Sequence, residues 1–231
     1  MKRLLPVTSL LVTCFAGGAQ AAPQVYTLDP AHTYPSFETS HQGMSYWRGK
    51  FNKVSGKVWL DREKQTGRVD ITIDMASVNF GFSAMDEHAR GEDFFDVAKY
   101  PTAHYVSDSI TFRNGTPVSI DGQLTLHGVT RPVKLDILEF TCKVNPMFKR
   151  EICGSDSRAE FDRRDFGIVK DVVDNKGKVR LEIQAEAMQG DAVPGPPPGR
   201  AGMPPGGPPG GPPGGPPGAP PGAPPGAPPT R

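Results

Sequence analysis

Apolar and polar residues alternate strictly over several stretches of this chain, and this pattern constrains the fold more than any other feature. In residues 179–187 the apolar side chains are Val, Leu, Ile, Ala and Ala, separated by Arg, Glu, Gln and Glu. The same alternation runs through residues 69–75, 118–126 and 133–137. A period of two residues is typical of a β-strand that buries one face and exposes the other. The sequence therefore predicts several strands that share one apolar layer.

Turn signals such as Asn114-Gly115 and Asp121-Gly122 separate the predicted strands. Only residues 83–97 have a helical pattern, with Ser83 as the candidate N-cap and Gly91 as an expected interruption. Many strands with one short helical segment predict an all-β domain. An antiparallel β-barrel of about eight strands and a β-sandwich both fit, and periodicity does not decide between them.

The first 21 residues predict a secretory signal peptide. A basic pair at positions 2 and 3 precedes an apolar run over residues 4–15, and Ala19-Gln20-Ala21 offers a small-residue cleavage site. The apolar run is too short to span a bilayer as a helix, so we expect no transmembrane segment. Residues 11–14 only weakly resemble a lipoprotein cleavage box, which makes a lipid on Cys14 the less favoured alternative.

The last 41 residues differ in composition from the rest of the chain. From Asp191 to Arg231 they contain 18 Pro and 12 Gly, and from Pro204 the sequence repeats PPGG and then PPGA. A repeat of four excludes a collagen triple helix, which needs Gly at every third position. Because almost no apolar side chains are present, we predict that residues 191–231 form a disordered Pro/Gly-rich tail. A solubilising spacer is the simpler role, and docking to an unknown partner is the alternative.

Residues 22–190 remain, and their number suits one domain with one core. They include 22 basic and 24 acidic residues, so the side chains carry about −2 at neutral pH. This near balance argues against a nucleic-acid partner bound through bulk positive charge.

Cys142 and Cys153 are the two cysteines of the mature domain. An even pair in an exported chain predicts a disulfide. Ten residues centred on Asn145-Pro146 separate them, and two strands joined by a turn would bring such positions opposite each other. A redox-active pair usually has closer spacing, as in C-x-x-C, so we predict a structural disulfide.

Catalytic signatures are missing from the sequence, which has no G-x-S-x-G, H-E-x-x-H, P-loop or G-x-G-x-x-G motif. Residues 85–93, with His88 and several carboxylates, are the best candidate for metal ligands. Such a run is more often a solvated helix face, so we expect neither a metal nor a cofactor. Motifs alone leave an exported all-β domain without an assigned ligand.

Several short motifs follow one another in a distinctive order. They are Tyr26-Thr27-Leu28-Asp29-Pro30-Ala31-His32-Thr33, Asp86-Glu87-His88, Asp93-Phe94-Phe95-Asp96-Val97, Lys99-Tyr100-Pro101, the segment GQLTLHGVT at 122–130, and Arg164-Asp165-Phe166-Gly167. In this order they resemble the YceI-like family of polyisoprenoid-binding proteins, over about residues 25–188. The resemblance implies a lipocalin-like antiparallel β-barrel in the periplasm. It also implies a long apolar tunnel for an isoprenoid chain or a similar fatty amphiphile, without a catalysed reaction.

From this implied tunnel we predict a set of lining side chains and a set of polar positions. The predicted lining residues are Val69, Ile71, Ile73, Phe94, Phe95, Leu124, Leu126, Leu135, Ile137, Phe166, Leu181, Ile183 and Ala185. The polar positions that match the family are His32, Asp86, His88, Arg164 and Asp165. These polar groups either contact a lipid head group or tie the helix to the barrel through buried hydrogen bonds.

Three positions depart from the family pattern, and the first is Thr33, which follows His32 where Ser is commoner. Met85 stands where the family usually has Arg, and Ala89 stands where it usually has Leu. The missing Arg puts in doubt a pairing with Asp86 that would order the helix. The smaller Ala89 either widens the tunnel or leaves a repacked core.

Three functions remain open at this point. A periplasmic binding or carrier protein for a long-chain lipid is favoured, with a homodimer possible. The alternatives are an exported structural or interaction protein that acts through its tail, and a metal-assisted enzyme.

Overall fold

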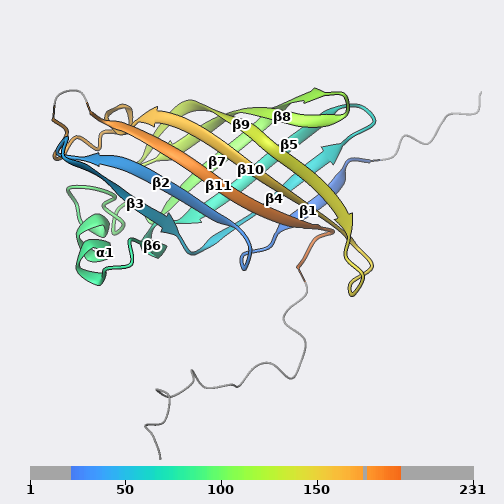
Figure 1. The fold of residues 1–231 in the computed structure, drawn as a ribbon, viewed down its shortest axis with the longest axis horizontal. Coiled ribbons are helices and arrows are strands. Elements are labelled where there is room, and N and C mark those ends of the chain that lie inside the picture. Colours follow the sequence, from blue (N-terminus) through green and yellow to red (C-terminus); the bar gives the residue numbers. More distant parts are fainter. Residues whose placement is uncertain (1–21, 174–175, 194–231) are drawn as a thin grey trace, which may run out of the picture. The chain divides into compact units, whose positions relative to one another are not determined.

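The alternating segments form one antiparallel sheet in the computed structural model, which describes residues 22–173 and 176–193 (Figure 1). The predicted signal peptide and nearly all of the predicted tail lie outside the described residues and stay predictions. The strands are β1 (Gln24–Leu28), β2 (Tyr34–His41), β3 (Ser45–Phe51), β4 (Val54–Asp61), β5 (Thr66–Asp74), β6 (Val78–Asn79), β7 (Thr102–Arg113), β8 (Thr116–Leu126), β9 (Val129–Val144), β10 (Glu151–Asp162) and β11 (Lys178–Gln189). The helical segments are η1 (Met75–Ser77), α1 (Ser83–Arg90) and η2 (Arg163–Phe166).

The sheet closes into a barrel of eight strands. In the order β1-β4-β5-β7-β8-β9-β10-β11 each strand pairs antiparallel with the next, and β11 pairs back with β1. The three other strands lengthen this barrel, since β2 follows β1 along β11, while β3 pairs with β2 and β6 with β3. The predicted antiparallel barrel is confirmed, and the sandwich alternative is wrong.

Two hairpin turns have backbones that suit their residues. Asn114-Gly115 joins β7 to β8 and His127-Gly128 joins β8 to β9, with φ angles of 53°, 78°, 52° and 74°. Positive φ at both central residues matches the twist of a two-residue hairpin. The predicted turn at Asp121-Gly122 is wrong, because both residues lie inside β8. Gly122 there leaves room for the ring of Tyr105.

A β-bulge in β9 changes which of its side chains face the barrel interior. Glu139 pairs with Asp156, and Ile137 pairs with Ser157, so Leu138 has no partner across the strand and is 50% exposed. One extra residue shifts the alternation of the strand by one position. The inward positions of β9 therefore change parity at this point.

Helix α1 lies at one end of the barrel, beside the turn between β2 and β3 (Figure 1). It is shorter than the predicted 83–97, because Gly91 takes an extended backbone and ends the helix. The N-cap residue is Phe82 and Ser83 is the first helical residue, so the predicted cap is off by one position. No helix in the described part of the chain is long and apolar enough to cross a membrane.

Side-chain hydrogen bonds hold α1 against η1, β6 and the residue that follows β6. The Asp86 carboxylate, which is 7% exposed, accepts the backbone N–H of Phe80 at 2.6 Å and the side-chain amide of Asn79 at 3.4 Å. Arg90 donates to the carbonyl oxygens of Ala76 and Val78. These bonds order the helix without an Arg at position 85.

Candidate functional site

Two apolar cavities meet inside the barrel. We call them the helix-end chamber, next to α1, and the far chamber; their volumes, which include space open to solvent, are about 1070 Å³ and 1170 Å³. Pro35, Ile73, Leu124 and Leu181 line both chambers, so the two spaces adjoin at these four side chains. The barrel therefore has an elongated apolar interior that is not filled by its own side chains.

The structure places nearly all of the predicted lining residues in these walls. Phe94, Phe95 and Leu126 line the helix-end chamber; Ile73, Leu124 and Leu181 line both; and Val69, Ile71, Leu135, Ile137, Ile183 and Ala185 line the far chamber. On β11 all five apolar positions of the alternation, from Val179 to Ala187, face these cavities. That these residues bind a ligand stays a prediction.

Phe166 lies outside both chambers. It has no exposed surface and packs edge-on against Phe161, with the ring centroids 5.1 Å apart. Phe161 lines the helix-end chamber, so Phe166 supports this wall from behind. Phe166 was predicted to line the tunnel and does not, because it lies in η2, a turn in which the chain leaves the direction of β10.

Sequence reasoning missed wall residues that follow bulges. Ile137 and Phe140 both line the far chamber although their numbers differ by three, because the bulge at Leu138 shifts the alternation. Tyr105 and Ile110 of β7 behave in the same way, since the pairing of this strand with β8 is also irregular between them. A pattern of strict period two cannot reveal such positions.

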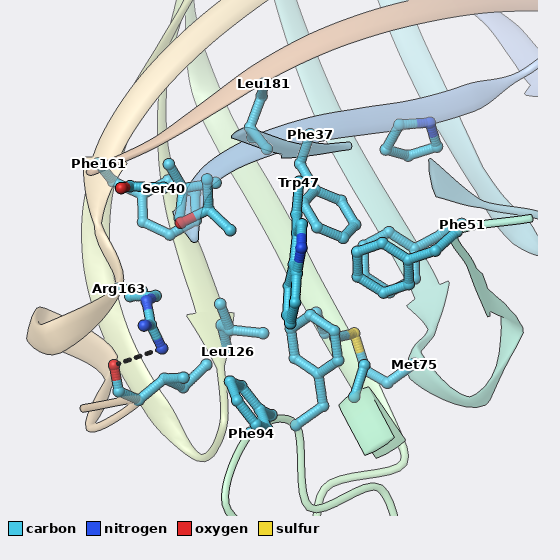
Figure 2. Close-up of a pocket in the computed structure, with 18 of the residues that line it drawn as sticks. Phe37, Ser40, Trp47, Phe51, Met75, Phe94, Leu126, Phe161, Arg163 and Leu181 are labelled. Carbon is cyan, nitrogen blue, oxygen red and sulfur yellow. Dashed lines mark hydrogen bonds between the residues drawn. The ribbon is translucent and has the colours of Figure 1, made fainter. Parts of the chain in front are cut away.

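Sequence reasoning also missed an aromatic cluster in the helix-end chamber. The Phe37 ring lies 5.5 Å from those of Phe51 and Phe80, and the indole of Trp47 stacks on His41 at 4.2 Å (Figure 2). Of these rings, Phe37, Trp47 and Phe51 come from β2 and β3, where alternation is less regular than in β11. The cluster gives this chamber a wall rich in aromatic rings.

A partly buried polar contact borders the far chamber at Tyr26. The Tyr26 hydroxyl donates to the Glu151 carboxylate at 2.5 Å, and Arg62 pairs with the same carboxylate at 2.7 Å. Burial and the bond to Glu151 raise the pKa of Tyr26 to about 12. The hydroxyl therefore stays protonated and ties β1 to β10 at neutral pH.

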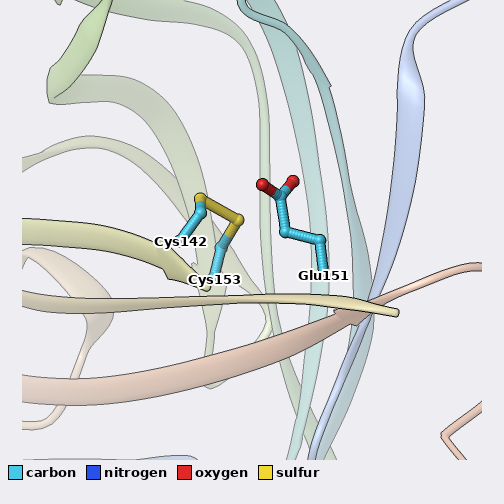
Figure 3. Close-up of side chains that lie close together, drawn as sticks. All are labelled: Cys142, Glu151 and Cys153. Carbon is cyan, nitrogen blue, oxygen red and sulfur yellow. A yellow bond between two sulfur atoms is a disulfide. The ribbon is translucent and has the colours of Figure 1, made fainter. Parts of the chain in front are cut away.

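The predicted pairing of Cys142 with Cys153 is confirmed by a disulfide that joins opposite positions of β9 and β10, with a Cα–Cα distance of 4.0 Å (Figure 3). The Glu151 carboxylate lies within 4.8 Å of both sulfur atoms. Because these sulfurs are bonded to each other, the group offers no thiolate to a metal ion. Cys153 also lines the far chamber, so the disulfide braces its wall.

The five predicted polar positions do not converge on one site. His32 is exposed and pairs with Asp29 at 2.8 Å, and Asp86 is used to fix α1. Arg164 pairs with Asp162 on the outside, and Asp165 is exposed. Of the five, His88 lines a chamber, where its ring contacts that of Phe94 at 4.8 Å.

The structure brings the charged residue Arg163 to the apolar wall, and sequence reasoning passed over it for its neighbour. It is 7% exposed and lines the helix-end chamber between Phe161 and Phe94 (Figure 2). The short η2 turn causes this, because consecutive residues of a helical turn point in different directions. Asp162 caps the turn through the N–H of Arg164, and Gly167 ends it with a φ of 78°.

Further polar side chains come from the segments around the same chamber. Ser40, His41 and Gln42 lie at the end of β2 and in the turn after it, and Asp171 lies in the loop before β11. In Figure 1 this turn, this loop and α1 lie together at one end of the barrel. The helix-end chamber thus combines an apolar interior with polar groups at one end of the barrel.

The sequence profile of the YceI-like domain matches residues 26–187. A UPF0312 protein from Shewanella denitrificans is 32% identical over 189 residues, which are 80% of this chain and 95% of that protein. The protein YceI of Escherichia coli O157:H7 is 31% identical over 189 residues, which are 81% of this chain and 98% of that protein.

Solved structures share the barrel. Burkholderia cenocepacia BcnA matches with a TM-score of 0.57 and 25% identity, over 69% of this chain and 98% of its own. A polyisoprenoid binding domain from Saccharophagus degradans, implicated in plant cell wall breakdown, matches with a TM-score of 0.53 and 18% identity, over 71% of this chain and 98% of its own. The second likeness shows a common fold.

Proposed function

The chain belongs to the YceI-like family, and we propose that it binds a polyisoprenoid or similar long-chain amphiphile inside its barrel and carries it, without catalysing a reaction. The observation that carries this proposal is the pair of adjoining apolar chambers. Their shared residues Ile73, Leu124 and Leu181 make a continuous apolar wall from one chamber to the other.

The physical basis is the hydrophobic effect. Each CH₂ group that leaves water contributes about 0.8 kcal/mol, so a long chain gains affinity from length alone and needs no dedicated motif. The walls provide aliphatic side chains in the far chamber and aromatic rings in the helix-end chamber. An elongated apolar interior of this kind fits a long thin chain better than a compact polar metabolite.

The fold of the Saccharophagus degradans domain agrees with this proposal, since that domain is described as polyisoprenoid binding. At 18% identity this likeness supports the fold, and the ligand proposal for the present chain rests on its own chambers. We also propose a periplasmic location. The predicted signal peptide and the disulfide between Cys142 and Cys153 support an oxidising compartment.

Native mass spectrometry of the full chain, purified from the periplasm of the expressing cell, tests this function. We expect an added mass that organic extraction removes and that fragments as a long-chain lipid. Refilling the extracted protein with a C16 or longer amphiphile should restore an added mass. The proposal is contradicted if the protein is purified without a bound lipid and takes up no chain of any length after extraction. A stoichiometric metal mass would favour an enzyme instead.

A further inference from the structure

We propose that Arg163 forms a subsite for an anionic head group, a phosphate or a carboxylate, in the helix-end chamber. This inference rests on the proposed binding of a long-chain amphiphile and adds the chemical class of its polar end. It comes from one buried side chain whose charge and hydrogen-bonding capacity the described residues do not fully satisfy.

Arg163 is held firmly by the backbone that follows it. Its Nη1 donates to the carbonyl oxygen of Ile168 at 3.4 Å and its Nη2 to that of Lys170 at 2.5 Å. Its Nε is buried and has no hydrogen-bond partner among the residues that the structure describes. A buried donor without an acceptor costs free energy, which a ligand with an acceptor atom would recover.

The charge of Arg163 also lacks a close partner. Within the described residues no carboxylate oxygen lies within 4.0 Å of its nitrogens, whereas Arg164 pairs with Asp162. Burial lowers the pKa of Arg163, while the more distant Asp171 and Asp162 act to raise it. An Arg side chain keeps its proton at neutral pH, so the apolar wall contains a positive charge whose hydrogen bonds, within the described residues, go to neutral carbonyl groups. Such a charge attracts an anion more strongly than an exposed one does.

The surroundings of Arg163 suit the junction between a head group and a chain. Its guanidinium carbon lies 5.9 Å from the centre of the Phe94 ring, and the His88 ring contacts the same Phe94. His88 lines the chamber and offers a second donor. Beyond them the wall turns apolar at Phe37, Phe51 and Leu126. A chain could thus lie in the apolar interior while its charged end meets Arg163.

Asp171 is the group that opposes an anion at this place. It lines the same chamber, is exposed, and acts on the charge of Arg163 from a distance beyond 4.0 Å. Replacing it with Asn removes a negative charge at an exposed position outside the strands, so we expect the barrel to fold as before. We therefore expect that removing the charge of Arg163 lowers the affinity for an anionic amphiphile and that removing the charge of Asp171 raises it.

Isothermal titration of the extracted full chain with three C16 probes tests the subsite: hexadecyl phosphate, hexadecanoate and hexadecanol. We expect at least one anionic probe to bind about tenfold or more tightly than the alcohol, as one charge-assisted hydrogen bond would provide. The preferred probe identifies a phosphate or a carboxylate. Arg163→Gln should remove this preference while the affinity for hexadecanol stays within about threefold. Asp171→Asn should enlarge the preference, and the exposed neighbour variant Arg164→Gln should not change it.

The outcomes separate the two proposals. If none of the probes binds, the lipid-binding function fails. If all three bind with equal affinity to the wild type, the tunnel stands and the Arg163 subsite is overturned. Thermal melting would reveal whether Arg163→Gln folds. If it does not, the test of the subsite rests on the wild-type preference and on Asp171→Asn, and an unchanged preference for the anionic probe in Asp171→Asn overturns the proposal.

Discussion

The ring of Tyr105 lies against the backbone of Gly122 so closely that a Cβ at position 122 would fall within 3.0 Å of Cζ, Oη and Cε2 of the ring. The Tyr105 hydroxyl donates to the carbonyl oxygens of Val133 at 2.9 Å and Ile120 at 3.3 Å. Burial raises the pKa of Tyr105, so its hydroxyl stays a donor at neutral pH. The ring is thereby fixed in the wall of the far chamber.

Gly122→Ala is expected to destabilise the barrel, because the added methyl group forces the held Tyr105 ring to move. Overpacking of this kind typically costs about 1–3 kcal/mol, which urea denaturation would measure. Gly154→Ala is the matched control in β10, since a Cβ there would meet its nearest atoms at 3.7 Å. Equal free energies of unfolding for the two variants would show that the Tyr105 ring is not fixed.

Strict alternation predicted β11 and its inward face well, because β11 has no bulge and one continuous apolar wall. Val179, Leu181, Ile183, Ala185 and Ala187 keep a single parity along the whole strand. The same reasoning did not predict that Phe140, which follows the bulge at Leu138, lines the far chamber. A bulge is decided by the pairing of two strands, and the sequence of one strand does not encode that pairing in its period.

Gly122 and Arg163 show two further limits of reading local patterns. The dipeptide Asp121-Gly122 has turn chemistry, yet the close contact with Tyr105 of β7, 17 residues earlier in the chain, needs a glycine inside β8. Arg163 and Arg164 are chemically identical neighbours. Their different environments follow from the direction in which η2 leaves β10, which only the three-dimensional structure defines.

Removal of residues 194–231 is expected to leave the melting temperature nearly unchanged, because the composition of this segment predicts no packing. The last contacts within the described residues come just before this segment. Lys57 pairs with Asp191 at 3.0 Å, and Arg150 donates to the carbonyl oxygen of Ala192 at 2.8 Å. A cut after Gly190 should therefore lower the melting temperature slightly more than a cut after Val193. If the chain cut after Val193 melts many degrees below the full chain, residues 194–231 pack on the domain.

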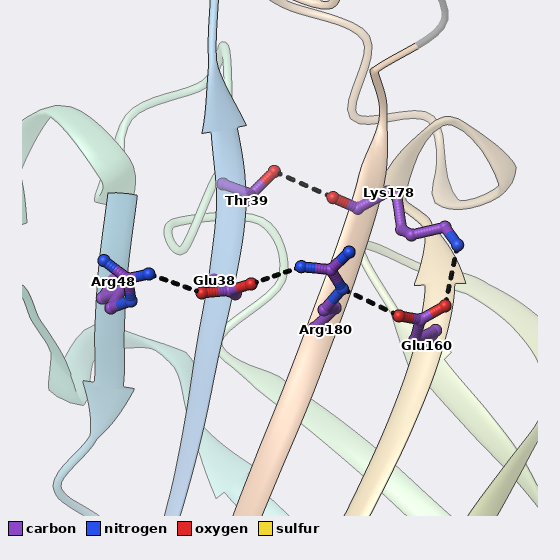
Figure 4. A network of polar contacts seen from close by, with 6 residues as sticks. All are labelled: Glu38, Thr39, Arg48, Glu160, Lys178 and Arg180. Atoms are coloured by element: carbon purple, nitrogen blue, oxygen red, sulfur yellow. Dashed lines mark hydrogen bonds and ion pairs between the residues drawn. The ribbon is translucent and has the colours of Figure 1, made fainter. Parts of the chain in front are cut away.

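A ladder of charges crosses four neighbouring strands on the outside of the barrel (Figure 4). Glu38 of β2 pairs with Arg48 of β3 at 3.0 Å and with Arg180 of β11 at 2.7 Å. Arg180 also pairs with Glu160 of β10 at 2.8 Å, and Lys178 pairs with the same carboxylate at 2.7 Å. The hydrogen bond from Arg180 lowers the pKa of Glu38, and those from Lys178 and Arg180 lower the pKa of Glu160, below the usual 4.5.

These lowered pKa values predict how the ladder contributes to stability as pH changes. A carboxylate with a lower pKa in the folded state stabilises it above pH 4.5, and this contribution is lost as pH falls through the folded-state value. Arg180→Met should therefore be less stable than the wild type at pH 7, and the difference should shrink toward about pH 3. The effect is small, since the pairs are exposed and screened by salt. Urea denaturation at both pH values measures it, and a difference that persists at low pH would rule out the ladder as its source.

Ala185 is one of the two alanines of β11 that line the far chamber, and it lies opposite Ser155 of β10. Ala185→Phe places a ring in space that a bound chain would otherwise occupy. We expect this variant to melt near the wild-type temperature, because the chamber is not filled by the protein's own side chains. It should nevertheless accept only shorter chains than the wild type.

Native mass spectrometry with a series of amphiphiles of increasing chain length would reveal this shift, recorded beside thermal melting of each variant. Glu182→Phe is the control, since it adds the same ring at an exposed position of the same strand. A filled core would respond differently: the ring would overpack it, with a loss of about 1–3 kcal/mol and no effect on ligand length. If Ala185→Phe takes up the longest chains fully at unchanged stability, the ligand does not reach the far chamber, and the binding site is confined to the aromatic chamber beside α1.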